Sequence, residues 1–187
     1  MSTPGRSKTP LNRARVVLAA VAHADAHGTD GLTMRSLAGV LGVAPMALYR
    51  HVAHKEDLID GMVDVVFAEM ELPSPAGGWK ASMRRRAVSA RQVLARHRWS
   101  IPLLESRTTP GPANMRHHDA VLAVLLDAGF TGATATRAFN VVDSYIYGFV
   151  LQETNLPFGD PDELSAVGAL MLEHISAEQY PHLVAVA

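Results

Sequence analysis

Residues 32–52 constrain the fold more strongly than any other stretch of this sequence. Thr33 is placed to accept hydrogen bonds from the free amides at the start of a helix, and apolar residues then recur at helical spacing as far as Leu41. Gly42 predicts a tight turn, and Pro45 suits the first turn of another helix because its missing N–H costs nothing there. The stretch therefore predicts two short helices joined by a glycine turn.

A small apolar core would hold these two helices at a fixed crossing. We expect it to comprise Leu37, Ala38, Leu41, Val43 and Leu48. Because that core uses one face of the second helix, residues 45–51, the opposite face is free to point outward. We expect the outward face to carry Pro45, Met46, Ala47, Tyr49 and Arg50. A short outward-facing helix is what enters a DNA major groove, about 12 Å wide, so a helix-turn-helix head is predicted.

Apolar residues at helical spacing continue on both sides of this stretch. The predicted helices cover residues 11–26, 34–41, 45–51, 55–71, 79–98, 101–106, 114–128, 133–155 and 162–177. No segment alternates apolar and polar residues over a sustained length. The predicted fold class is therefore all-α, with an N-terminal three-helix helix-turn-helix head and a C-terminal helical bundle.

The clearest break in the chain is the segment of Pro and Gly at residues 72–78, which a continuous helix cannot accommodate. We predict a flexible basic arm over residues 1–10, the head over 11–54, a connecting helix over 55–72 and a helical body over 73–187. Residues 1–60 carry seven Lys or Arg and five Asp or Glu, whereas the remainder carries ten and thirteen. This weak asymmetry fits a chain that touches phosphate at one end.

Several functional classes lack support in this sequence. There are no cysteines, which excludes disulfides and thiolate metal sites. The first ten residues lack the apolar stretch of a secretory signal, and no apolar run approaches the roughly 18 residues of a membrane span. No catalytic or phosphate-binding motif is present. We expect a soluble cytoplasmic protein that makes no membrane contact, is not an enzyme and needs no cofactor.

The head resembles that of the TetR family of bacterial repressors. The motif LTMRSLAGVLGVAPMALYRHV, followed by HKEDLIDGMVD, matches that family without gaps over roughly residues 13–65. Three weaker segments, RHRWSIPLL, LLDAGFTG and YIYGFVLQE, are similar to the C-terminal domain of the tetracycline-repressor-like subgroup. The resemblance covers most of the chain and implies a DNA-binding transcriptional regulator.

The resemblance also implies DNA-contacting residues. Thr33 and Arg35 would meet DNA at the start of the second helix; Pro45, Met46, Ala47 and Arg50 would face base edges or sugars; and Tyr49, His51 and Lys55 would contact phosphates. The chemistry suits these roles, because Arg reads guanine in a bidentate manner and Lys makes point contacts with phosphate. The alternatives are that Arg35 is a solvated helix residue and that Tyr49 is a core aromatic with its hydroxyl at the surface.

The predicted helix over residues 133–155 is apolar on nearly every side. One stripe comprises Phe139, Val142, Ile146 and Val150, and another comprises Ala138, Val141, Tyr145 and Phe149. Such a helix must be covered on both faces, by the chain's own core and by an identical subunit. The resemblance implies a homodimer, whose heads would read a palindromic operator at a spacing of about 34–36 Å. The alternative is the central helix of a large monomer.

The family's body holds an apolar cavity for a small-molecule effector, unidentified here. The candidates for lining this cavity, by their positions relative to the family, are Trp99, Leu104, Phe139, Asn140, Asp143 and Tyr147. Asp143 needs a ligand or, alternatively, an Arg partner or exposure at the dimer edge. Leu104 and Glu71 align where the tetracycline-binding members have histidines, so neither tetracycline nor a magnesium site is predicted.

Two polar runs in the body receive no functional role. We expect residues 84–86, all Arg, to form a solvated, salt-bridged surface, and we expect no metal at His117 and His118, which are helical neighbours. The competing class of protein is an all-α enzyme or carrier for an apolar molecule. A regulator of this kind can also activate transcription, because its effect depends on where the operator lies relative to the promoter.

Overall fold

The computed structural model describes residues 10–104, 106–155, 161–172 and 175–186. Within those ranges every regular element is a helix and no strand is present, which confirms the all-α prediction. The chain divides into two units, residues 1–151 and 152–187. Nearly all of the predicted arm, residues 1–9, lies outside the described residues.

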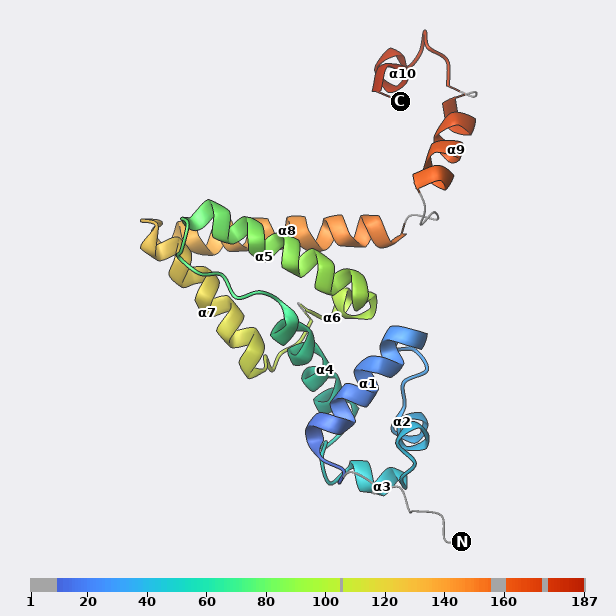
Figure 1. The fold of residues 1–187 in the computed structure, drawn as a ribbon, viewed down its shortest axis with the longest axis vertical. Coiled ribbons are helices and arrows are strands. Elements are labelled where there is room, and N and C mark those ends of the chain that lie inside the picture. The colour runs from blue at the N-terminus through green and yellow to red at the C-terminus, as the bar shows by residue number, and fades with distance from the viewer. Residues whose placement is uncertain (1–9, 105, 156–160, 173–174, 187) are drawn as a thin grey trace, which may run out of the picture. The chain divides into compact units, whose positions relative to one another are not determined.

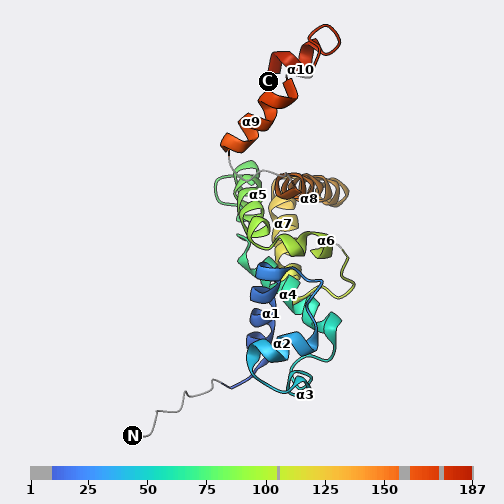
Figure 2. The same ribbon diagram turned by 90° about the vertical axis from the view of Figure 1, so that its right-hand side faces the viewer.

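The head comprises three helices, α1 (Arg13–His27), α2 (Met34–Leu41) and α3 (Pro45–Leu48). They gather at one end of the first unit in Figures 1 and 2. The first helix begins because the Asn12 side chain accepts a hydrogen bond of 2.8 Å from the amide of Arg15. It ends at Gly28, whose φ of 74° suits a residue without a Cβ.

Local hydrogen bonds explain why α2 and α3 form as predicted. Thr33 Oγ1 accepts from the amide of Ser36 at 3.0 Å, and Ser36 Oγ accepts from the amide of Thr33 at 2.9 Å, which completes a capping box. Gly42 ends α2 in the left-handed conformation, and Pro45 is the first residue of α3. The third helix is shorter than predicted. After Leu48 the chain tightens into a turn.

The apolar core predicted for the head is confirmed. Leu37, Ala38 and Leu48 are buried, and Leu41 and Val43 pack against them partly exposed. The same core continues into α1 and α4 (Lys55–Glu69), with buried residues that include Val16, Ala20, Leu58, Met62 and Val66. The head and the connecting helix therefore share one hydrophobic core.

The body of the first unit contains α5 (Trp79–Arg96), the 3₁₀ helix η1 (Arg98–Ser100), α6 (Ile101–Leu104), α7 (Pro112–Asp127) and α8 (Gly132–Asn155), whose last four residues belong to the second unit. In Figure 1, α4 leads away from the head toward α7. The second unit also contains α9 (Pro161–Leu172) and α10 (Pro181–Val186). The last of these helices was not predicted from the sequence.

A buried polar cluster lies at the centre of the body. Arg86 is 1% exposed, and its Nη1 lies 2.6 Å from Oδ1 of Asp143 on α8. Its Nε donates to Nε2 of His117 on α7 at 2.7 Å, and the hydroxyl of Tyr147 donates to Asp143 at 3.2 Å. The prediction of a solvated side chain is therefore wrong for Arg86. This residue lies on the face of α5 that packs against α7 and α8, where His117 and Asp143 are its buried partners. For Asp143, the alternative of an Arg partner is the one observed.

His117 is held neutral by its surroundings. Burial lowers its pKa to about 3, with further lowering from the charges of Arg86 and His118. Because Arg86 donates to Nε2, that nitrogen accepts and the single ring proton lies on Nδ1. A second proton would have to go on Nε2, which already accepts from the Arg86 guanidinium, so protonation would set two donors and two positive charges against each other.

This depressed pKa predicts an acid-sensitive fold. In the unfolded chain a histidine titrates near its ordinary value of about 6.5, so between that pH and about 3 the unfolded chain binds a proton that the folded chain does not. The contribution of His117 to the free energy of unfolding is therefore fully present above the pKa of the unfolded chain, about 6.5, and is lost as the pH falls toward the folded pKa of about 3. Between pH 7 and about pH 4.5, His117 alone should remove about 3 kcal/mol from the free energy of unfolding, measured by urea denaturation.

The substitution His117→Gln keeps a neutral acceptor for Arg86 and should flatten this pH dependence. His27→Gln, at an exposed site near the end of α1, is the matched control and should leave the dependence unchanged. Equal slopes in His117→Gln and the unmodified protein would show that the ring is not the group responsible.

Candidate functional site

The helix α3 presents most of its predicted DNA-facing residues to solvent. Leu48 is fully buried, whereas Met46 on the opposite side is 73% exposed. Pro45, Tyr49 and Arg50 are also exposed, and Ala47 is half-buried. The predicted outward face is therefore confirmed, apart from the partial burial of Ala47. The exposed tyrosine hydroxyl and guanidinium suit contacts with DNA, and the exposed Met suits an apolar contact with a base.

The remaining predicted DNA-contacting residues lie at the starts of α2 and α4 and in the turn between α3 and α4. Arg35 and Lys55 are exposed, and Lys55 is the first residue of α4. Thr33 is exposed but its hydroxyl is engaged in the helix cap, while the half-buried His51 offers its carbonyl to Arg13 at 3.2 Å. Helix starts favour anions, but the first turn of α4 already carries the carboxylates of Glu56 and Asp57, so the exposed cations of Arg35 and Lys55 are what suit this end of the first unit to phosphate.

An ion pair sets α4 against α1 in the head. Arg13 donates to both carboxylate oxygens of Asp57, at 2.6 and 3.0 Å, and Asp57 also accepts from the amide of Ala53 at 2.7 Å. The hydrogen bond from Arg13 lowers the pKa of Asp57, and the same bond raises the pKa of Arg13. The bidentate geometry orients the start of α4, and with it Lys55, relative to α1.

Other carboxylates of α4 hold the segment between α6 and α7. Arg107 in that segment donates to Asp60 at 2.6 Å and lies 2.8 Å from Glu56. Asp64 accepts from the amides of Ala113 and Asn114, at 2.8 and 3.0 Å, and so caps the start of α7. A displacement of this segment would therefore act directly on α4, which carries Lys55.

A second connection joins the end of α1 to the body. His97 places Nδ1 2.7 Å from Asp25 and Nε2 3.2 Å from Glu69, and the Trp99 indole donates to Asp25 at 2.7 Å. Burial alone would raise the pKa of Glu69, but hydrogen bonds from Arg96 and His97 lower it overall. Trp99, predicted in the effector pocket, therefore packs against the base of the head.

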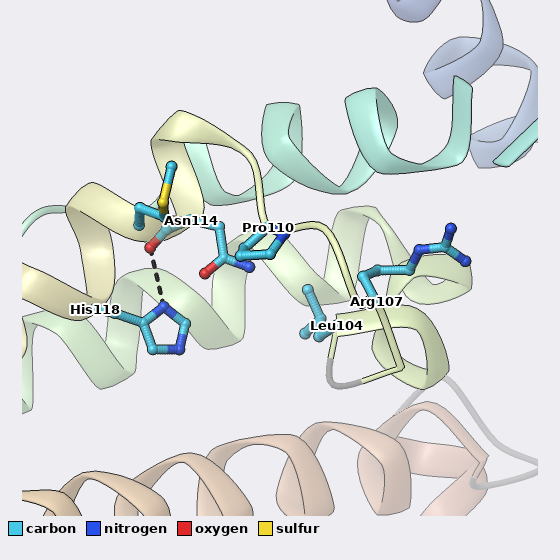
Figure 3. Close-up of a pocket in the computed structure, with 6 residues that line it drawn as sticks. Leu104, Arg107, Pro110, Asn114 and His118 are labelled. Carbon is cyan, nitrogen blue, oxygen red and sulfur yellow. Dashed lines mark hydrogen bonds between the residues drawn. The ribbon is translucent and has the colours of Figure 1, made fainter. Parts of the chain in front are cut away.

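Two cavities in the body contain the other predicted pocket residues. One, of about 340 Å³, is lined by Phe139, Asn140, Asp143, Ser144 and Tyr147, all on α8. The other, of about 300 Å³, is lined by Leu104, Arg107, Pro110, Asn114, Met115 and His118 and is drawn in Figure 3. The structure thus brings four of the six predicted residues together and places Leu104 in a separate cavity. Apart from Leu104, the residues of the second cavity were missed, because the sequence shows no pattern that joins α6 to α7.

A third and larger cavity, of about 700 Å³, lies where α1, α4 and residues 109–112 meet.

No group of three or more potential metal ligands occurs within the described part of the chain. Among the same residues, no helix has the length and apolar character needed to span a membrane.

These features define a class of protein: a helix-turn-helix regulator whose head is joined by α4 to an all-helical body that contains cavities. Residues 72–187 match the family model described as the tetracyclin repressor-like C-terminal domain. The chain therefore belongs to the TetR family of transcriptional regulators.

Two curated relatives support this membership. An HTH-type transcriptional regulator of Saccharopolyspora erythraea is 34% identical over 95% of this chain and 75% of its own length. The HTH-type transcriptional repressor DrrR1 of Streptomyces coeruleorubidus is 37% identical over 78% of this chain. The match spans only 55% of the length of DrrR1.

Two solved structures, of the TetR family protein ActR and of BioQ, show the same fold. ActR of Streptomyces coelicolor in complex with actinorhodin aligns with a TM-score of 0.80 at 26% identity, over 95% of this chain and 86% of that one. BioQ with its double-stranded DNA operator aligns with a TM-score of 0.69 at 26% identity, over 79% of this chain and 90% of that one.

The contact between α4 and the start of α7 depends on a glycine. A Cβ atom at Gly111 would collide with the carboxylate of Asp64, so Gly111→Ala should displace that carboxylate from the amides of α7. We expect a loss of about 1–3 kcal/mol in the free energy of unfolding, measured by urea denaturation. Gly132→Ala, at a position with open space and no positive φ, is the control. Equal effects of the two substitutions would contradict a tight contact at Gly111.

Proposed function

We propose that this protein is a homodimeric repressor that binds a palindromic DNA operator and is released by a small-molecule effector. The observation that carries this proposal is the segment formed by α3 and the turn that follows it, which buries Leu48 in the head and leaves Met46, Tyr49 and Arg50 outside. The BioQ complex with an operator supports DNA as the partner, and the name of DrrR1 supports repression. Operator DNA would place the protein in the cytoplasm.

In this proposal the DNA-contacting residues divide into three groups. Arg50, with Pro45, Met46 and Ala47, reads base edges or sugars from α3. Tyr49, His51 and Lys55 contact phosphates, and Thr33 and Arg35 approach DNA from α2. Only the first group specifies sequence, because phosphate contacts are the same for every base pair.

An exposed apolar face on α8 supports the proposed homodimer. Val141 and Tyr145 are 68% and 71% exposed, whereas Ile146 on the same helix is buried in the chain's own core. Tyr145 stacks on Phe149 at 6.1 Å between ring centroids, which extends the exposed face along the helix. Contiguous apolar surface of this kind is typical of protein interfaces.

Effector binding in the body would act on the head through α4. The cavity lined by Leu104 adjoins the segment that Glu56, Asp60 and Asp64 hold, so an effector that displaces this segment moves the carboxylates of α4. Such a ligand weakens DNA binding only if it binds the displaced arrangement better. The other candidate effector contacts remain Trp99, Phe139, Asn140, Asp143 and Tyr147. The ActR complex with actinorhodin supports a small-molecule effector.

The DNA-binding proposal predicts different effects for Lys55 and Arg50. Lys55→Ala should weaken binding to every duplex and reduce the salt slope by about one unit, because one phosphate contact is lost. Arg50→Ala should cost about 1–3 kcal/mol on the preferred operator and relax the preference at one base pair of each half-site. Selection of bound DNA from a random pool, followed by titration at several salt concentrations, measures both.

Arg84→Ala is the control for both substitutions, because Arg84 is an exposed cation on α5 in the body. The assignment of Arg50 is refuted if Arg50→Ala keeps the preference of the unmodified protein. The proposed function itself fails if no duplex binds in low salt. An inverted repeat among the selected sequences is the expected result.

If α8 forms the dimer interface, a single charged residue introduced on its exposed apolar face should separate the subunits. Val141→Glu places a carboxylate in the proposed interface, and burying it there without a partner is unfavourable. We expect a monomer by light scattering at a concentration where the unmodified protein is a dimer, and weaker binding to the inverted repeat. Leu126→Glu, at an exposed apolar position on α7, is the matched control and should remain dimeric. A dimeric Val141→Glu variant would exclude this face.

A further inference from the structure

The cavity between α6 and α7 is lined by a side-chain carboxamide that has no hydrogen-bond partner among the described residues. Asn114 is 6% exposed and lines the cavity, and its carboxamide makes no hydrogen bond to any described residue. Only its backbone atoms are engaged, the amide with Asp64 and the carbonyl with His118. Neither polar atom of the carboxamide is sealed from solvent, so the group can donate to and accept from a ligand that enters the cavity.

The hydrogen bond of His118 determines which ring nitrogen can accept. Nδ1 lies 2.9 Å from the backbone carbonyl of Asn114, as the dashed line in Figure 3 shows. A carbonyl only accepts, so Nδ1 carries the proton, and in the neutral ring Nε2 is an acceptor. Nε2 makes no hydrogen bond to the described residues and is not sealed in the core. The rings of Phe67 and Phe139, at 5.9 and 4.8 Å, hold the imidazole in place.

The rest of the lining disfavours a charged ligand. The guanidinium of Arg107 is already neutralised by Asp60 and Glu56 on α4. The other lining residues, Leu104, Pro110 and Met115, are apolar. The cavity therefore presents one oriented acceptor and one carboxamide against an apolar wall.

We propose that this cavity recognises a neutral, largely apolar ligand that carries a hydroxyl or phenol group. The hydroxyl donates to Nε2 of His118, and Asn114 binds a second polar group of the same molecule. His118 is thus the residue that distinguishes a hydroxyl from an ether or a carboxylate. The identification of this ligand with the effector depends on the function proposed above, whereas the binding preference does not.

The test uses the full chain and three matched probes: 1-naphthol, 1-methoxynaphthalene, which keeps the oxygen but cannot donate, and 1-naphthoate, which is an anion. Isothermal titration at neutral pH measures the affinities. We expect 1-naphthol to bind about tenfold more tightly than 1-methoxynaphthalene, as the loss of one buried hydrogen bond implies. His118→Phe should abolish the difference, and His118→Gln, which retains an acceptor, should preserve much of it. His27→Phe, at an exposed site, should change nothing.

Three results would overturn the inference: equal affinity for 1-naphthol and its methyl ether, preference for 1-naphthoate, or no binding of any probe. Comparing the probes on the unmodified protein keeps the test decisive even if His118→Phe does not fold. Operator binding is measured in parallel on the same sample. If the protein binds DNA but shows no preference for the hydroxyl probe, this inference fails and the proposed function stands. If it prefers the hydroxyl probe but binds no DNA, the proposed function fails and this inference stands.

Discussion

The ion pairs and hydrogen bonds along α4 are the interactions on which the rest of this structure depends. One face of the helix supplies Leu58, Met62 and Val66 to the core that the head and body share. Its carboxylates bind Arg13 in the head, Arg107 after α6 and the first amides of α7. Each partly exposed pair contributes little stability by itself. Together they determine where the head lies relative to the body, because they join α4 to three segments: α1, the segment after α6 and the start of α7.

The polar cluster around Arg86 has a different physical role from these partly exposed pairs. An Arg that is 1% exposed is tolerated only because α7 and α8 bring His117 and Asp143 to it. Replacing a buried pair by apolar residues is often neutral for stability, whereas removing one partner is costly. The cluster therefore specifies how α5, α7 and α8 pack, and it reduces the number of predicted pocket residues that are free to bind a ligand. Asp143 already has its charge partner.

The sequence predicted the head more completely than the cavities. Thr33, Gly42 and Pro45 act on amides or dihedral angles within a few residues, so their roles can be read from local order. The resemblance to TetR proteins then identified the family correctly. The cavity beside His118 was missed because its polar character depends on partners far along the chain. Arg107 is neutralised by Asp60, 47 residues earlier, and the solvated role predicted for Arg86 failed for the same reason.

Local chemistry in the sequence by itself determined that the chain is helical, where most helices begin and end, and which face of α3 is left outside the core of the head. Only the tertiary structure decided which charges are neutralised, that Trp99 binds Asp25 at the base of the head, and that His118 lines a cavity with Leu104. The physical reason is the range of the interactions. Caps and helical periodicity act within one or two turns, whereas burial and charge pairing depend on which distant side chains the packing brings into contact.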